Sequence, residues 1–222
     1  MLMAKLIIAF HIFFLLSFSS FSQNSLSTSG KAIINEIGDT IILRGMGLGG
    51  WMVQEGYMMA PGGFSSTQYQ IRDRLIELIG LQETNIFYDN WLSNHVRKID
   101  IDSMKQWGFN LVRAPIHYNL FTQPIENESY PFAYTEKEKG FQLLDSLLSW
   151  CKENEIYLMI DLHAAPGGQG YNADISDYDP SKPSLWESEY NQHKTVELWK
   201  RIANRYKDEE WIAGYDLINE PN

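Results

Sequence analysis

Glu220 is the residue in this sequence best placed to transfer a proton. It follows the apolar run at residues 212–218, with only Asn219 between them. A carboxyl at the end of a buried strand is partly desolvated, which raises its pKa and suits a proton donor near neutral pH. Asn219 can hydrogen-bond a hydroxyl of a bound molecule, and Pro221 fixes the direction in which the chain leaves the strand. Because an Asn-Glu-Pro triplet can also be a helix N-cap, the assignment depends on its surroundings.

Side chains that end two other apolar runs could act together with Glu220. Arg113 belongs to the run at residues 109–114, and its planar guanidinium can hold a carboxylate ionised, although a purely structural ion pair explains it as well. Strand alternation places His163 on the same side as Asp161, which we expect to support His163 or Arg113. A lone histidine is more often a packed core residue than a functional one, and the case for His117 is weaker still.

Aromatic residues crowd the segments that follow these runs. Flat rings with polar rims suit the apolar faces of pyranose rings, and aromatic side chains commonly line concave sites. Packing inside long loops explains part of the set. Among them, Trp51 and Tyr118 are the two that we expect to contact or support a substrate. The set is Trp51, Tyr57, Tyr118, Phe121, Tyr171, Tyr178 and Trp186.

Two patterns resemble cofactor or metal sites and are set aside. Gly45, Gly47 and Gly50 match G-x-G-x-x-G, but a dinucleotide site needs a helix directly afterwards, and the residues up to Gly63 predict none. The acidic loop at residues 172–179 fits no EF-hand spacing, so we expect it to be a solvated loop, although calcium binding there stays open. No His/Cys cluster indicates zinc. We therefore expect neither a metal nor a cofactor.

The elements that must position these side chains alternate along the chain. Short, apolar, β-rich runs lie at residues 43–48, 109–114, 156–162 and 212–218, as expected of parallel strands that are buried on both faces. Amphipathic segments separate them, so the order indicates βαβ units. In such folds the chemistry lies at the carboxyl ends of the strands, because the loops converge there. The candidate residues all follow such ends.

The helices and the N-terminal hairpin are predicted from their boundary signals. We expect a hairpin over residues 32–43 that turns at Gly38, and helices over 69–79 and 94–107 that end at Gly80 and Gly108. Thr135 and Glu138 predict a capping box for a helix that runs through residue 150. The single cysteine, Cys151, excludes an intramolecular disulfide and is expected to be a buried thiol. The face of the next helix is predicted to contain Val196, Trp199, Ile202, Ala203 and Tyr206.

Charge and the N-terminal segment narrow the class of partner. The net charge of -10 disfavours nucleic acid and anionic lipid but not a neutral polymer. Lys5, the apolar stretch at residues 6–18 and the small Ser20 and Ser22 predict a signal peptide over 1–22, and hence a secreted or periplasmic protein without a membrane span. A retained N-terminal anchor is the alternative, and the apolar stretch is short for one. Residues 23–30 are predicted as a disordered lead-in and 31–222 as the folded part.

Taken together, these motifs resemble glycoside hydrolase family 5. They are residues 43–51, Val112-Arg113-Ala114-Pro115, Asp161-Leu162-His163 and Asn219-Glu220-Pro221, in the family's order. The segment at 162–169 is similar to the exo-β-1,3-glucanase-like branch. The resemblance implies a (β/α)8 barrel and retaining hydrolysis of β-glucan-type polysaccharides or oligosaccharides. It assigns the acid/base role to Glu220 and supporting roles to Asn219, Arg113 and His163.

The resemblance also predicts what this chain does not contain. The family's nucleophilic Glu follows the seventh strand, whereas we count four strands here, so we expect an incomplete barrel that is inactive by itself. Glu55, Asp161 and Asp216 are expected to be poorly placed as substitutes. A non-catalytic secreted carbohydrate-binding protein is the alternative, followed by a structural or adhesion fragment. The linkage cleaved, exo or endo action and the oligomeric state stay open.

Overall fold

The structure is a computed structural model that describes residues 25–59, 63 and 65–222. The predicted signal peptide over 1–22 lies outside the described residues. The chain divides into two compact units, one up to Ile41 and one from Ile42 onward, which are described separately. Within the described residues, no helix is long and apolar enough to span a membrane.

The first unit contains a small antiparallel hairpin. Strands β1 (Ser27–Ser29) and β2 (Ala32–Ile34) pair directly, and Gly30 turns between them with a φ of 60°. The predicted turn at Gly38 exists, since its φ is 88°, but it closes only a single bridge between Ile34 and Thr40. The strand pair therefore lies earlier than predicted, and part of the expected disordered lead-in forms β1.

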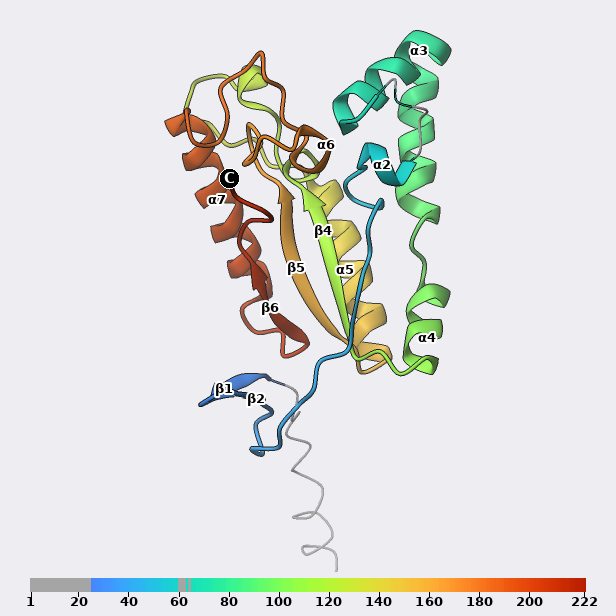
Figure 1. The fold of residues 1–222 in the computed structure, drawn as a ribbon, viewed down its shortest axis with the longest axis vertical. Helices are drawn as coiled ribbons and strands as arrows, with labels where there is room; N and C mark the ends of the chain where they lie inside the picture. Colours follow the sequence, from blue (N-terminus) through green and yellow to red (C-terminus); the bar gives the residue numbers. More distant parts are fainter. Residues whose placement is uncertain (1–24, 60–62, 64) are drawn as a thin grey trace, which may run out of the picture. The chain divides into compact units, whose positions relative to one another are not determined.

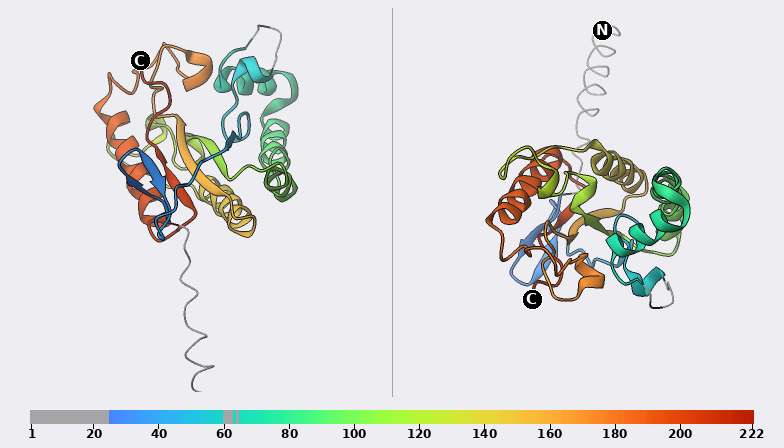
Figure 2. Two further views of the ribbon diagram at one scale, coloured as in Figure 1. Left: turned by 60° about the horizontal axis from the view of Figure 1, so that its bottom comes forward. Right: turned by 90° about the horizontal axis from the view of Figure 1, so that it is seen from above.

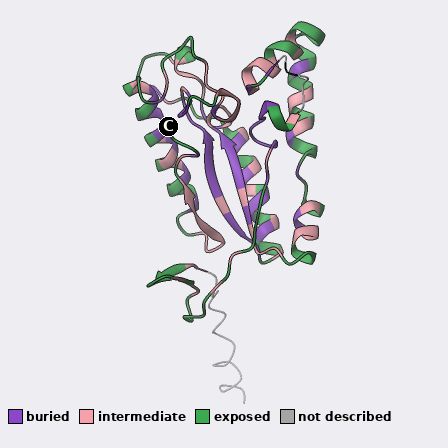
Figure 3. Ribbon diagram, viewed as in Figure 1, coloured by how far each residue is buried: buried purple, intermediate pink, exposed green. Residues whose placement is uncertain are grey.

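The second unit is built on a parallel sheet of four strands in the order β3-β4-β5-β6 (Figure 1). The strands are β3 (Gly45–Gly47), β4 (Leu111–His117), β5 (Tyr157–Ala164) and β6 (Ile212–Asp216). β4 and β5 are buried, whereas β3 is exposed and β6 is half-buried (Figure 3). The expectation of burial on both faces is thus confirmed only for the two central strands, because β3 and β6 are the edges of the sheet.

Alternation along β4 and β5 separates the core from the site. Val112, Ala114 and Ile116 on β4, like Leu158, Ile160 and Leu162 on β5, are fully buried on one face. Arg113, Asp161 and His163 have the opposite parity and therefore point to the other face. The long helices pack around the outside of the sheet, against its apolar face (Figure 2). They are α3 (Gln68–Asn94), α4 (Lys98–Gln106), α5 (Glu138–Glu153) and α7 (Glu189–Tyr206). The short helices α2 (Gly56–Met59) and α6 (Ala173–Ser176) lie near the carboxyl ends of the strands (Figure 1), and two 3-10 turns, η1 (Tyr118–Leu120) and η2 (Ile125–Asn127), follow β4.

Helix boundaries confirm some predictions and correct others. Gly80 interrupts α3 with a φ of 82°, but a second helical segment follows at once to Asn94, which was not predicted. Gly108, with a φ of 87°, follows α4 as predicted. The prediction of a capping box at Thr135 was wrong, because Lys137 is the N-cap of α5. The backbone N–H and the hydroxyl of Thr135 both donate to Glu128 instead.

The packed faces of α5 and α7 explain where the core lies. On α5, Cys151 is fully buried with Leu144 and Leu147, and burial raises the pKa of its thiol to about 12, so the prediction of a core thiol is confirmed. On α7, Ile202 and Tyr206 are buried as predicted. Val196 and Ala203 are exposed, and Leu198 and Thr195 complete the buried face instead.

Candidate active site

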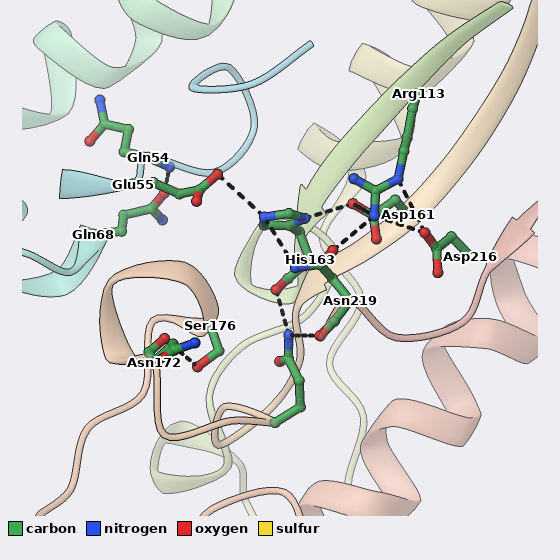
Figure 4. Close-up of polar contacts among 11 residues, drawn as sticks. Gln54, Glu55, Gln68, Arg113, Asp161, His163, Asn172, Ser176, Asp216 and Asn219 are labelled. Carbon is green, nitrogen blue, oxygen red and sulfur yellow. Dashed lines mark hydrogen bonds and ion pairs between the residues drawn. The ribbon is translucent and has the colours of Figure 1, made fainter. Parts of the chain in front are cut away.

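Arg113 is the central cation of a cluster of side chains from β4, β5 and β6 and the segment after β6 (Figure 4); it is the third residue of β4, because that strand continues to His117. Its Nη2 lies 3.0 Å from Asp161 Oδ2 and 2.8 Å from Asp216 Oδ2, and its Nε donates to the same Asp216 oxygen at 3.1 Å. Nη2 also donates to Asn219 Oδ1 at 2.9 Å. The predicted pairing of Arg113 with a neighbouring carboxylate is therefore present, but it involves two carboxylates and neither is Glu220.

His163 lies between two buried carboxylates. Its Nδ1 is 2.7 Å from Asp161 Oδ2 and its Nε2 is 3.3 Å from Glu55 Oε1. Burial lowers the pKa of His163, but these two carboxylates outweigh it and raise the pKa to about 9. The imidazole therefore carries a positive charge at neutral pH. The expectation that Asp161 supports His163 or Arg113 is confirmed for both.

Asn219 is held from three directions. Its backbone N–H donates to Leu162 O at 3.1 Å, its carbonyl accepts from Gln169 Nε2 at 2.8 Å, and its Oδ1 accepts from Arg113. Its Nδ2 lies 3.4 Å from His163 Nε2, which cannot accept a hydrogen bond while it is protonated. The amide N–H groups of Asn219 are therefore free to donate to a bound molecule.

Glu220 opens onto a pocket of about 270 Å³ beside this cluster. Its backbone has a φ of 43°, an uncommon conformation for a residue other than glycine. β6 ends at Asp216, so Glu220 lies four residues beyond the strand, and its side chain is exposed. The expected partial desolvation of the carboxyl is therefore not seen. The pocket is lined by Gly47, Gly49, Glu55, Tyr57, Met58, Arg113, Pro115, His163, Ile175, Asn219 and Glu220.

The loop after β5 fixes the segment that carries Glu220. Asn222 Oδ1 accepts from Tyr171 N at 2.7 Å, and the backbone N–H of Asn222 donates to Gln169 O at 3.3 Å. Between these two contacts, Gly170 permits a close approach: a Cβ there would come within 2.8 Å of Asn222 Oδ1 and 3.2 Å of Glu220 O. The position of Glu220 therefore depends on the β5 loop as well as on β6.

Glu55 and Gln169 belong to this site, although the sequence did not predict it. Glu55 was considered only as a substitute nucleophile, yet it is 2% exposed, lines the pocket and pairs with His163. Gln169 is fully buried and donates to the carbonyls of His163 and Asn219. The sequence did contain a signal that Glu55 belongs to the site, because Glu55 lies four residues after Trp51 of the Gly-Gly-Trp motif that follows the first apolar run.

Three predicted substrate-contacting residues lie elsewhere. Trp51 is a core residue, 2% exposed, whose indole N–H donates to Leu92 O at 2.8 Å. His117 and Tyr118 line a different pocket, where His117 Nε2 donates to Asp177 Oδ2 at 2.8 Å and His117 Nδ1 accepts from Asn119 N.

The acidic loop at 172–179 is only partly solvated. Asp177 has an 11% exposed side chain that pairs with His117 and accepts from Tyr69 N, which contradicts a fully solvated loop at this residue. Asp179 instead accepts from Ser181. Within residues 25–59, 63 and 65–222, no group of three or more His, Cys, Asp or Glu side chains is arranged to hold a metal ion.

Sequence comparison relates the chain to glycoside hydrolases. A sequence model of the family described as Cellulase (glycosyl hydrolase family 5) matches residues 70–222. The chain is 36% identical over 197 residues to a beta-xylosidase of Phanerodontia chrysosporium, covering 88% of this chain and 39% of that protein. It is 29% identical to a probable glucan 1,3-beta-glucosidase A of Aspergillus niger, covering 82% of this chain and 41% of that protein. The chain thus spans about two fifths of the length of these curated relatives.

Solved structures agree on the fold. The structure of a rutinosidase from Aspergillus niger superimposes with a TM-score of 0.61 at 18% identity, covering 80% of this chain and 48% of that one. The four parallel strands and their helices correspond to part of the (β/α)8 barrel that the family adopts. The matched segment contains Arg113, His163, Asn219 and Glu220. The chain therefore belongs to glycosyl hydrolase family 5, the cellulase family.

Proposed function

We propose that the protein of which this chain is at least a part hydrolyses O-glycosidic bonds in β-glucan-type polysaccharides or oligosaccharides by a retaining double displacement. The observation that carries this proposal is the pocket that brings Glu220 together with Asn219, His163 and Glu55. Glu220 is the acid/base in this proposal. It faces solvent, while the other three side chains are buried and held in place.

The buried cluster supplies hydrogen-bonding groups for sugar hydroxyls. Glu55 offers carboxylate oxygens, and Asn219 offers the amide N–H groups left free by the protonated His163. Arg113 fixes the orientation of the Asn219 amide, because it takes up the Oδ1 atom. Such preorganised groups hold the scissile bond near the proton donor without reorganisation during the reaction.

In the first step of the proposed reaction, Glu220 protonates the leaving oxygen while a second carboxylate attacks the anomeric carbon. In the second step, Glu220 takes a proton from water, which then hydrolyses the glycosyl-enzyme. Retention requires the two carboxyls to lie roughly 5–5.5 Å apart. Glu55 is paired with His163, so we propose that a later strand of the barrel supplies the nucleophile.

The substrate class is proposed from charge and from the relatives. The relatives are a beta-xylosidase and a glucan 1,3-beta-glucosidase, both of which are named for neutral β-linked sugars. The net charge of -10 disfavours anionic polymers. Together with the predicted signal peptide over 1–22, this supports action on an extracellular or periplasmic β-linked glycan.

The test is Glu220→Gln in the full-length protein. We expect hydrolysis of a natural β-glucoside to fall by about 10²- to 10⁴-fold, because the amide cannot protonate the leaving oxygen. An aryl β-glucoside with an acidic phenol needs little protonation, so its glycosylation step, measured as a burst, should change far less.

The matched control is Glu83→Gln, the same chemical change at an exposed site on α3, which should leave both rates unchanged. Equal losses on the two substrates would contradict the acid/base role. A wild-type protein that binds β-glucan but hydrolyses neither substrate would support a non-catalytic carbohydrate-binding protein instead.

A further inference from the structure

A second pocket, of about 500 Å³, lies apart from Glu220 and shares no lining residue with its pocket. Its lining comes from η1 and η2, the loop after β5 and the first turns of α3 and α7. Its volume is within the range of about 300–1,000 Å³ that is typical of small-molecule sites. None of the chemistry proposed for Glu220 uses it.

The floor of this pocket is a glycine turn. Gly167 and Gly168 have φ values of 81° and 76°, which L side chains rarely adopt. A Cβ on Gly167 would come within 2.2 Å of Asn191 Nδ2, and one on Gly168 within 2.8 Å of Tyr178. The turn therefore packs directly against α7 and the loop before it, which only glycine allows at these two positions.

The walls of the pocket are held by side-chain contacts, one a hydrogen bond of a histidine and one an ion pair. Asp177, which adopts a φ of 52°, accepts from His117 on one side and from the backbone N–H of Tyr69 on the other. On the opposite wall, Lys182 Nζ lies 2.9 Å from Glu126 and 3.8 Å from Asp179. The largely buried contact between His117 and Asp177 fixes its wall before any ligand binds, which lowers the entropic cost of binding, whereas the exposed Lys182 pair contributes little.

The groups that remain available are phenols and carboxylates. Tyr69, Tyr118 and Tyr190 line the pocket, and in the described part of the chain the hydroxyls of Tyr118 and Tyr190 bond to no protein group. Asp73 adds an exposed carboxylate. The lining contains four carboxylates against the single ammonium of Lys182, so an anionic ligand is disfavoured. Rings with polar rims next to hydrogen-bond acceptors suit a ligand that is rich in hydroxyls.

We propose that this pocket is a second carbohydrate site, which binds a neutral sugar unit on the tyrosines Tyr69, Tyr118 and Tyr190, outside the pocket that Glu220 lines. His117 and Tyr118, which the sequence predicted to contact or support substrate, act here in this proposal: Tyr118 contacts the sugar and His117 positions Asp177. The choice of a β-glucan probe rests on the proposed function, whereas the pocket and its charge do not.

The experiment measures binding and turnover separately in the full-length protein. Binding of a β-1,3-linked glucose hexamer is titrated calorimetrically in a Glu220→Gln background, so that the probe is not consumed. Tyr190→Ala, in the first turn of α7, should weaken this second binding event by about tenfold, because it removes one ring and one hydroxyl. In the protein that keeps Glu220, Tyr190→Ala should leave the hydrolysis rate of a small aryl β-glucoside within about twofold of the wild-type rate, since Tyr190 does not line the pocket of Glu220.

Further variants keep the result interpretable if Tyr190→Ala unfolds the protein. Tyr118→Phe keeps the half-buried ring and removes only one hydroxyl, so it should weaken hexamer binding by a few-fold with an unchanged thermal midpoint. Tyr130→Ala, at a 63% exposed tyrosine outside the pocket, is the matched control and should change nothing. A galacturonic acid hexamer, which is anionic, should bind at least tenfold more weakly than the glucose hexamer.

Several outcomes would overturn the proposal. The first is that Tyr190→Ala and Tyr118→Phe both bind the glucose hexamer as tightly as the wild-type protein does. The second is that the anionic galacturonic acid hexamer binds as tightly as the glucose hexamer. The third is that a cationic glucosamine hexamer binds and the neutral glucose hexamer does not. Failure of the proposed hydrolysis is distinguishable, because it would remove turnover of the aryl glucoside in the parent protein while leaving the calorimetric result intact.

Discussion

At the scale of single residues, Gly170 tests how the acid/base is positioned. We expect Gly170→Ala to press on the segment that carries Glu220, because the new Cβ would lie 3.2 Å from the backbone oxygen of Glu220 as well as 2.8 Å from Asn222 Oδ1. A displacement of about 1 Å at a catalytic group can cost on the order of 10²-fold in rate. The full-length protein should therefore lose kcat on β-glucosides by about that factor, measured by steady-state kinetics.

Gln142→Ala, at an exposed position of α5, is the control for this change and should leave kcat unchanged. If Gly170→Ala retained the wild-type kcat, the β5 loop would have no part in positioning Glu220.

His163 gives the folded protein a pH dependence of known sign. Its pKa rises from 6.5 to about 9 on folding, so its stabilising contribution is complete below pH 6.5 and is lost as the pH rises through about 9. Such a shift corresponds to about 3 kcal/mol in the free energy of unfolding. Denaturant unfolding at several pH values between 6 and 9.5 should show this decline, and His163→Gln should remove it. A decline of the same size in His163→Gln would assign it to other groups.

At the scale of elements, a buried ion pair fastens the loop between β4 and α5 to α7. Lys194 and Glu128 have side chains that are 1% and 0% exposed and are in contact. Burial raises the pKa of Glu128, but hydrogen bonds from Lys194, Thr135 and Gln123 outweigh it and lower the pKa to about 2. Lys194→Met should therefore cost about 3–5 kcal/mol of unfolding free energy, measured by denaturant titration, because it leaves a buried carboxylate without its cation.

Two controls separate this pair from surface charge. Adding Glu128→Gln to Lys194→Met should recover part of the loss, since no unpaired charge then remains. Lys200→Met breaks an exposed pair with Glu197 on the same helix and should cost less than about 1 kcal/mol. A cost for Lys194→Met no larger than that for Lys200→Met would show that burial of the pair is energetically unimportant.

The same loop shows why some elements could be predicted from the sequence and others could not. The Thr-x-x-Glu pattern at Thr135 is a local signal for a helix start, but Glu128, seven residues away, takes up the threonine. Gly80 was a correct signal for a break, yet helix resumes immediately, because a glycine changes the direction of the chain without preventing the next turn. Local patterns thus gave the type of element, and tertiary hydrogen bonds decided its boundaries.

At the scale of the whole molecule, the outer edges of the sheet dictate how an isolated piece behaves. Within the described residues, β3 and β6 each pair on one side only, and Ile42, Met46 and Leu217 near these edges are 65%, 36% and 64% exposed. A polypeptide of residues 23–222 should therefore self-associate, as measured by light scattering, and should not hydrolyse β-glucans, because a double displacement needs two carboxyls.

Met46→Lys in that polypeptide should reduce self-association, because a charge on an edge strand opposes edge-to-edge pairing. A monodisperse monomer of residues 23–222 that hydrolyses β-glucan would contradict both the edge argument and the proposed mechanism.

Only part of the candidate site could be predicted from the residues at the ends of the strands. Arg113, His163, Asn219 and Glu220 were found because each lies at or just after an apolar run, and parallel strands bring such ends together. Trp51 satisfied the same rule but packs inward, because its indole N–H is taken up by Leu92 O. Glu55 and Gln169 were missed because their roles depend on His163 and Asn219, contacts that no spacing along the chain reveals.

The contact between Gly170 and the segment ending at Asn222 also restricts how this barrel can be re-engineered. Chimeric enzymes are often assembled by exchanging one strand-and-loop unit at a time between relatives. Here Gly170 in the loop after β5 lies against Asn222 and the backbone of Glu220, so a unit transplanted from a relative with a bulkier residue at position 170 would press on the segment that carries the proposed acid/base. The two loops must be inherited or exchanged together, as a single cassette.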